Sequence, residues 1–169
     1  MTEDSRSFYP ADPRKIWHYT SFPALLSIFQ KKQLWFTPLA ELEDPWEGRS
    51  VRWYKRRSDK EHEDLARKGS VHCWHTGNED SDLMWKVYAP AFGVAIESIV
   101  SALQASFCGA EKSKVRCEPV RYVESSLQPD PFVKRKHFKE ECEFRAHLPY
   151  ENTRPPRPAE TNHRRTPGR

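Results

Sequence analysis

The sequence predicts a single α/β domain of the α+β kind, with short helices and a mixed, partly antiparallel sheet. The chain has 169 residues, of which 37% are hydrophobic, and this is enough for one hydrophobic core. Short β-type runs alternate with short segments of helical periodicity. Residues 141–146 alternate charged with small or apolar side chains, as a half-buried strand does. We place the domain at residues 15–149, after a loose lead-in over 1–14 and before a tail over 150–169.

The first part of the chain is predicted as strand, helix and strand. A β-type run covers residues 16–19. Ser21 is a good N-cap and Pro23 falls in the first turn, where its missing N–H costs nothing, so a helix is predicted to begin there. Its apolar residues over 25–29 repeat at helical spacing. A second short strand is predicted over 34–36.

The middle of the chain is more polar. Proline and glycine surround Trp46 in residues 43–48, which indicates a turn or an ordered loop. Residues 49–69 are mostly charged and are predicted to form a solvated helix supported by opposite charges four residues apart. A third short strand is predicted over 71–74.

Further elements are predicted after residue 80. They are a helix over 83–88, a strand over 92–96, a helix over 99–107 and a strand over 115–123. Ser81 or Asp82 could cap the first of these helices. Pro119 interrupts the last strand, and an interrupted strand indicates the edge of a sheet.

The final strand carries the charges of most interest. A period of two places Glu141, Glu143 and Arg145 on one face of a strand over 141–146. Two like charges on one face repel unless a cation or a proton lies between them, and Arg145 is the nearest candidate cation. This pattern fits either a functional site or a solvated strand face.

Composition limits the class of protein. The net charge is +4, but five Arg against two Glu lie in residues 151–169, so the predicted domain is close to neutral. This argues against a nucleic-acid surface that covers the whole domain. The tail holds four Pro and no apolar residue larger than Ala159, so we expect it to be disordered. The four Cys have no CxxC spacing, and no apolar stretch reaches membrane-spanning length, so we expect a cytoplasmic protein with reduced thiols and no membrane contact.

An ordered set of short motifs resembles one family. The set is Trp17-His18-Tyr19-Thr20, the Asp44–Gly48 loop, Met84-Trp85 with Tyr88, Gly93–Ile96, and Lys134 ahead of Glu141-x-Glu143-x-Arg145. It is similar to the DUF2971 family of small bacterial proteins of unknown function, and this resemblance suggests a link to phage defence or mobile elements. Two features depart from the family pattern. Only Cys73 and Thr76 survive of the Cys-Phe-Ser motif, and similar sequences continue beyond the Glu-x-Glu-x-Arg strand, which suggests a truncated or divergent C-terminus here.

The same layout resembles ADP-ribosyltransferase-like folds in outline. That resemblance implies a glycosyl (ADP-ribosyl) transferase with NAD as its substrate. His18 would hold the nicotinamide ribose, Tyr88 or Trp85 would stack on the nicotinamide, and Glu143 would orient a ribose hydroxyl, with Glu141 as a second carboxylate. A carboxylate beside a developing oxocarbenium ion is a plausible stabiliser.

The expected cleft contains the catalytic candidates and a set of ligand-binding candidates. These binding candidates are Tyr19, Thr20, Asp44, Trp46, Glu47, Trp85, Tyr88, Lys134 and Arg145.

Two other kinds of site use residues of this sequence. His72, Cys73 and His75 lie within four residues, but zinc sites favour longer loops between ligand pairs, so no metal is predicted. The alternative to an enzyme is a nucleic-acid or protein binding module. The basic runs 134–137 and 52–57 lie near aromatic residues such as Phe132, a composition that suits phosphates and stacked bases, although a solvated charged face is the simpler reading.

Overall fold

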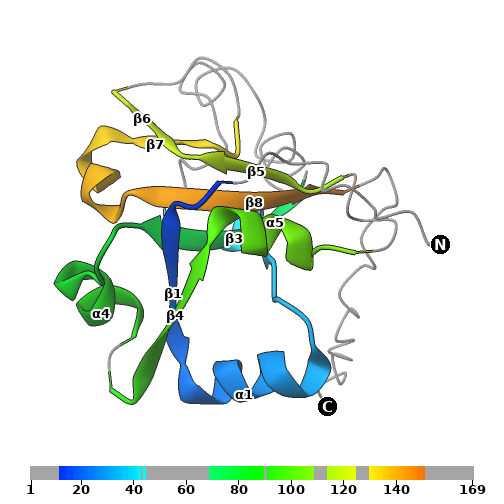
Figure 1. Ribbon diagram of the computed structural model, residues 1–169. Helices are drawn as coiled ribbons and strands as arrows, with labels where there is room; N and C mark the ends of the chain where they lie inside the picture. Colours follow the sequence, from blue (N-terminus) through cyan, green and yellow to red (C-terminus); the bar gives the residue numbers. More distant parts are fainter. Residues whose placement is uncertain are drawn as a thin grey trace, which may run out of the picture.

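A computed structural model describes residues 12–42, 44, 69–89, 91–108, 114–124 and 130–150. Its centre is a six-stranded sheet in the order β4-β1-β3-β8-β5, with β2 also paired to β3 (Figure 1). The strands are β1 (Lys15–Ser21), β2 (Thr37–Pro38), β3 (Gly69–Thr76), β4 (Gly93–Ile99), β5 (Arg116–Pro119) and β8 (Glu143–Pro149). All the pairings described in this sheet are antiparallel. The sheet is strongly twisted, so that β1 and β4 run at a steep angle to β3 and β8 (Figure 1).

The remaining elements are short. A small parallel pair is formed by β6 (Arg121–Val123) and β7 (Val133–Arg135). The α-helices are α1 (Phe22–Lys31), α4 (Asp82–Tyr88) and α5 (Val100–Ser106), and the 3-10 helices are η1 (Leu39–Glu41) and η3 (Lys136–Glu141). The predicted mixture of helices and strands is confirmed, but the main sheet is antiparallel to a greater extent than expected. No helix in the described part of the chain is both long enough and apolar enough to cross a bilayer.

Serine caps define two of the helices as the sequence predicts. The Ser21 hydroxyl accepts the Ala24 N–H at 3.3 Å, and α1 follows with Pro23 in its first turn. The Ser81 hydroxyl accepts the Met84 N–H at 3.5 Å and caps α4. In both cases a side-chain oxygen satisfies an N–H that has no partner within the helix.

Three predicted strands are wrong in their bounds. The strand expected over 34–36 occurs instead at Thr37–Pro38, where it pairs with the start of β3. The strand expected over 115–123 is two strands, because β5 ends at Pro119 and β6 belongs to the small parallel pair. Pro119 does lie on a sheet edge, as predicted. The final strand begins at Glu143 rather than at residue 141.

Several predictions fall outside the described residues. They are the loop over 43–48 except Asp44, the helix over 49–69 except Gly69, most of the lead-in over 1–14, and the tail beyond Tyr150.

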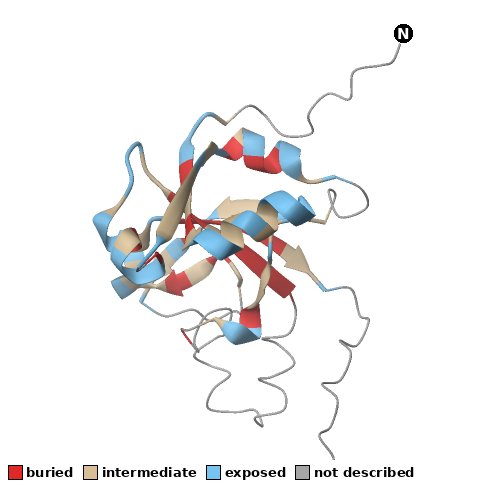
Figure 2. Cartoon of the chain, turned by 90° about the horizontal axis from the view of Figure 1, so that it is seen from below, coloured by how far each residue is buried: buried red, intermediate tan, exposed pale blue. Residues whose placement is uncertain are grey.

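Side chains on the two faces of the sheet pack into two separate clusters. On the first, which we call the core face, Ile16, Trp74 and Phe144 pack against Val100 and Leu103 of α5. On the other, which we call the pocket face, Tyr19 packs against Met84 and Ala89 at α4. The central strands β3 and β8 are buried along most of their length, whereas α1 has no buried residue (Figure 2).

Candidate functional site

A pocket of about 540 Å³ opens over the pocket face. This volume is typical of small-molecule sites. Its aromatic walls include Trp17, Tyr19, Tyr88 and Phe138, and its charged walls include Asp44, Lys134, Arg135, Glu141, Glu143 and Arg145. Strands β1, β3 and β8 supply the floor, and α4, η1, β7 and η3 supply the sides. Residues far apart in the sequence therefore share one hollow.

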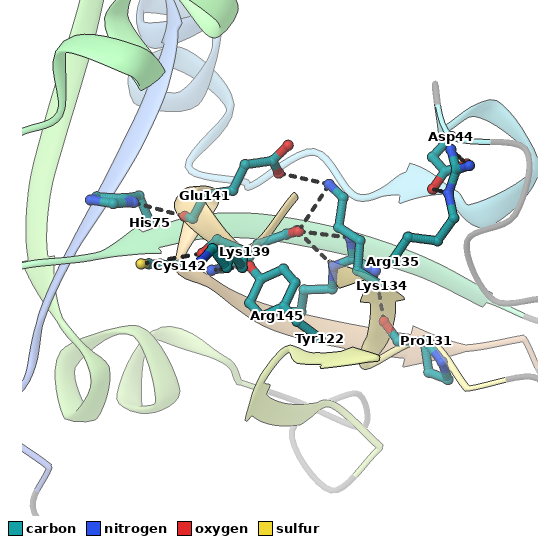
Figure 3. A network of polar contacts seen from close by, with 11 residues as sticks. Asp44, His75, Tyr122, Pro131, Lys134, Arg135, Lys139, Glu141, Cys142 and Arg145 are labelled. Carbon is teal, nitrogen blue, oxygen red and sulfur yellow. Dashed lines mark hydrogen bonds and ion pairs between the residues drawn. The ribbon is translucent and has the colours of Figure 1, made fainter. Parts of the chain in front are cut away.

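Glu143 and Arg145 form a buried ion pair at the bottom of this pocket. They lie two residues apart on β8, so their side chains leave the same face of the strand. Arg145 donates from Nε to Glu143 Oε1 at 2.6 Å and from Nη2 to Oε2 at 2.8 Å. Its Nη1 donates to the Pro131 carbonyl oxygen at 2.8 Å (Figure 3). Arg145 is 1% exposed and Glu143 is 5% exposed, so water screens this pair very little.

These contacts decide the charge of Glu143. Burial acts to raise the pKa of this carboxyl, but Arg145 and Lys134 outweigh it, and the pKa lies below its ordinary value. The Cys73 thiol also hydrogen-bonds to Glu143 and favours the ionised form. Glu143 is therefore a carboxylate at neutral pH, held in one orientation.

Lys134 joins Glu143 to Glu141. The Nζ of Lys134, on β7, lies 2.6 Å from Glu141 Oε2 and 3.4 Å from Glu143 Oε2 (Figure 3). Its side chain is only 6% exposed. The cation between the two acids is therefore Lys134, whereas Arg145 pairs with Glu143. The sequence motifs predict Lys134 as a binding residue of this cleft, but they name Arg145, and not Lys134, as the cation between the acids.

Glu141 is not on the strand, which corrects the prediction that all three charges share one strand face. Glu141 is the last residue of η3, and Cys142 follows in a left-handed conformation with φ 42°. The Cys142 N–H donates to the Lys139 carbonyl oxygen, so the chain turns between the two glutamates. Both carboxylates still line the pocket, but Glu141 reaches it from the side rather than from the sheet.

Two phenols flank the carboxylates. The Tyr122 hydroxyl accepts the Glu143 N–H at 2.7 Å, and burial raises the pKa of Tyr122 to about 12. Tyr88 lines the pocket, and burial followed by the nearby Glu141 raises its pKa above the ordinary value. Both hydroxyls are therefore protonated at neutral pH. Tyr122 was not among the predicted site residues, since its position in a broken strand gives no sign of this contact.

A second ion pair closes one side of the pocket. Arg135 donates from Nε to Asp44 Oδ2 at 3.0 Å and from Nη2 to Oδ1 at 2.9 Å (Figure 3). The Asp44 side chain is 3% exposed, whereas that of Arg135 is 41% exposed. Asp44 was a predicted binding residue, and Arg135 was missed. Trp46 and Glu47, predicted in the same loop, lie outside the described residues.

His18 borders the pocket, but its ring belongs to the other face of the sheet. Its centroid is 4.3 Å from that of His72 and 5.3 Å from that of Trp74, and Trp74 is part of the core-face cluster. The register pairs His75 with Glu143 and Trp74 with Phe144, so Glu143 leaves the opposite face. His18 and Glu143 both line this pocket, as the resemblance to ADP-ribosyltransferases implies, but strand alternation sends their side chains to opposite faces of the sheet.

The protonation of His18 follows from its surroundings. Its Nδ1–H donates to the Cys73 carbonyl oxygen at 2.9 Å. Burial lowers the pKa of His18, so the imidazole is neutral at pH 7. This hydrogen bond crosses from β1 to β3, which are paired directly only at Ile16–Thr76 and Trp17–His75.

The other predicted binding residues divide into two groups. Tyr19 lines the pocket, and its hydroxyl accepts the Ser81 N–H at 2.7 Å. Thr20 and Trp85 are not part of the pocket lining. Trp85 meets the Tyr19 ring edge-on at 5.3 Å and donates from Nε1 to Asp80 at 2.7 Å, so it supports Tyr19 from outside.

The residues weighed as metal ligands are split between the faces. His72 contacts Trp74 on the core face, while Cys73 and His75 alternate to the pocket face. Within the part of the chain that the structure describes, no three His, Cys, Asp or Glu side chains are placed to hold a metal ion.

The residues of the basic run at 134–137 also differ in how far they are exposed. Phe132 is fully buried and Lys134 is engaged with two carboxylates, so neither is open to a base or a phosphate. Lys136 and His137 are exposed. The run at 52–57 lies outside the described residues.

Comparison of the chain with family models, with curated proteins and with solved structures finds no match. The resemblances to DUF2971 and to ADP-ribosyltransferase-like folds therefore remain predictions.

Proposed function

We propose that the pocket binds a nucleotide such as NAD and supports transfer of its ADP-ribosyl group. The observation that carries this proposal is the convergence of Glu141 and Glu143 on one ammonium group, that of Lys134, beneath aromatic walls. Cleaving a bond from ribose to nicotinamide places positive charge on the ribose, and a carboxylate fixed in a dry site stabilises such charge.

The two carboxylates have different roles in this proposal. Glu143 is held by both nitrogens of the Arg145 fork, so its oxygens are engaged. The side chain of Glu141 is 13% exposed, against 4% for that of Glu143, and its carboxylate pairs with Lys134. We therefore assign Glu141 to the ribose and treat Glu143 as a positioning residue that keeps Lys134 in place.

The aromatic walls suit a planar ring. Tyr88 is 39% exposed and faces the carboxylates, so a flat heterocycle that covers it would remove apolar surface from water. In the transfer step the bond from ribose C1′ to the nicotinamide nitrogen breaks and leaves its electron pair on nicotinamide. The oxygen of an acceptor hydroxyl then bonds to C1′, and its proton is released to water. We assign no role in this step to His18, because its ring packs against His72 and Trp74.

Binding is tested by thermal unfolding with NAD. A ligand at 100 times its Kd adds about 2.7 kcal/mol to the free energy of unfolding. We expect a rise in Tm with millimolar NAD, and release of nicotinamide measured by chromatography when an acceptor is present. No rise in Tm would contradict the proposal.

The variants separate binding from chemistry. Glu141→Gln should retain the Tm shift and lose nicotinamide release. Glu124→Gln is the matched control, because Glu124 is an exposed acid that pairs with Lys136 away from the carboxylate pair. Equal nicotinamide release by the two variants would show that Glu141 does not take part in the transfer step.

A binding module for nucleic acid is the second candidate. It is favoured by the exposed basic side chains of Lys136, His137 and Lys139 around a shallow surface depression at η3. Binding by these groups would be weak and would fall steeply with salt. Fluorescence anisotropy with single-stranded DNA at two salt concentrations tests it, and an affinity that is absent or insensitive to salt would exclude it.

A further inference from the structure

The two edges of the main sheet are protected very differently. β5 has four residues, among them Arg116, Glu118 and Pro119, and charges and proline are the usual means of preventing an edge from pairing. β4, at the other edge, runs for seven residues from Gly93 to Ile99 with no proline. Among the described residues, β1 is the one strand that pairs with β4.

The single charge on β4 is already neutralised. Glu97 lies 2.8 Å from Lys15 of β1 in an exposed ion pair. The other six residues are glycine, serine or apolar. An edge with these properties is a template for another strand.

We propose that β4 pairs antiparallel with β4 of a second copy of this chain, so that one sheet continues through a symmetric dimer. A two-fold axis makes the contact self-complementary, because the same strand serves on both sides. The pairing also satisfies the backbone N–H and C=O groups of the alternate residues of β4 that point away from β1.

The sequence of β4 fits one symmetric register. With Ile96 opposite the partner's Ile96, Ala95 lies opposite the partner's Glu97 and Val94 lies opposite the partner's Ser98. No like charges then face each other, which would be unfavourable. Ile96 packs against the core-face cluster within its own chain, so the two isoleucines would join the two cores.

This register also covers exposed apolar side chains at the ends of β4. Gly93 lies opposite the partner's Ile99, so Phe92 comes to lie beside that residue. Phe92 is 93% exposed and Ile99 is 38% exposed. Burial of large apolar side chains adds to the backbone pairing, which by itself would give a small interface.

The first test is the mass of the full chain in solution. Sedimentation equilibrium over a range of concentrations should show a shift from one chain to two. A single monomeric mass up to about 100 µM, where any interface of micromolar Kd would be occupied, would overturn the proposal.

Charge variants test the register. Val94→Lys with Ser98→Lys places two like-charged pairs across the axis, and we expect dimerisation at least about tenfold weaker. Val94→Lys with Ser98→Glu changes the same two positions to charged residues but makes two opposite-charge pairs across the axis, so it should restore the dimer. Equal masses for the two double variants would overturn this register. Circular dichroism shows whether both are folded.

Cross-linking provides a second measurement. In a chain whose exposed Cys108 and Cys142 are replaced by Ser, Ile96→Cys should form a covalent dimer on mild oxidation, since the two introduced thiols meet at the axis. Ser98→Cys in the same background should not, because it faces the partner's Val94. Cross-linking of Ser98→Cys in preference to Ile96→Cys, or of neither, would overturn the proposal.

Discussion

The ammonium of Lys134 lies 2.6 Å from Glu141 and 3.4 Å from Glu143, and so joins two carboxylates that belong to different elements. Around it, Arg145 binds Glu143 through two nitrogens and Tyr122 binds the Glu143 backbone. Among the described residues, two acids and two cations share this buried cluster, so their charges balance. This balance makes the removal of any one member costly, and several predictions depend on it.

Removal of Arg145 should destabilise the fold strongly. Arg145→Ala leaves Glu143 buried without its main partner, and breaking a buried pair in this way costs about 3–5 kcal/mol. Urea denaturation measures the change in the free energy of unfolding. The double variant Glu143→Ala with Arg145→Ala should cost less than the sum of the single variants, because neither leaves the other unpaired. A loss below about 1 kcal/mol for Arg145→Ala would show that the pair has little structural role.

Tyr122→Phe should cost about 1–3 kcal/mol, because it removes the acceptor of the buried Glu143 N–H. The matched control is Tyr150→Phe, since Tyr150 is 42% exposed. Chemical denaturation of both variants measures the difference. Equal effects would mean that the hydrogen bond to Glu143 contributes nothing particular.

Stability should fall as the pH drops from 6.5 towards 4.5. Burial, followed by the neighbouring His18, lowers the pKa of His72 to about 3, and burial, followed by Arg116, lowers that of His147 to about 4. A depressed histidine pKa means that the unfolded chain binds protons that the folded chain does not. Each such histidine therefore costs about 1.4 kcal/mol per pH unit below its unfolded pKa near 6.5.

The contribution of His72 to this pH dependence can be isolated with a variant. A variant is needed because the pKa of Glu143 is lowered from 4.5 in the folded chain, so this carboxyl also loses stabilisation near pH 4.5, where it binds protons in the unfolded chain. Denaturation of the wild type at pH 4.5, 5.5 and 6.5 should show the loss, and His72→Gln should reduce its slope. An unchanged slope in His72→Gln would mean that His72 is not kept neutral by the fold.

Gly93→Ala should destabilise the junction between α4 and β4. A Cβ at Gly93 would lie 2.3 Å from both the Cβ and the carbonyl oxygen of Ala89, so the backbone must shift. We expect a loss of about 1–3 kcal/mol, as for other overpacked sites. Gly77→Ala, whose Cβ would meet its nearest atoms at 3.0 Å, should cost less. The Tm values of the two variants measure this, and a smaller loss in Gly93→Ala would contradict the packing.

The sequence by itself determined the local features of this protein. Ser21 and Ser81 begin helices because a hydroxyl one residue before the helix satisfies a free N–H, and this needs only neighbouring residues. Pro119 lies on an edge because it cannot donate to a central ladder. Glu143 and Arg145 share a face because a strand has a period of two.

The tertiary structure alone decided how the site is assembled. The face on which His18 lies relative to Glu143 depends on the register between three strands, and a shift of one residue would reverse it. The link from Lys134 to both glutamates, and that from Tyr122 to the Glu143 backbone, join segments whose separation along the chain carries no periodic signal. Glu141 lies outside the strand because the chain turns at Cys142, whose left-handed conformation is stabilised by a hydrogen bond from its N–H to the Lys139 carbonyl oxygen. Such contacts arise only when the chain is folded, because their energy comes from burial and from partners that the local sequence does not specify.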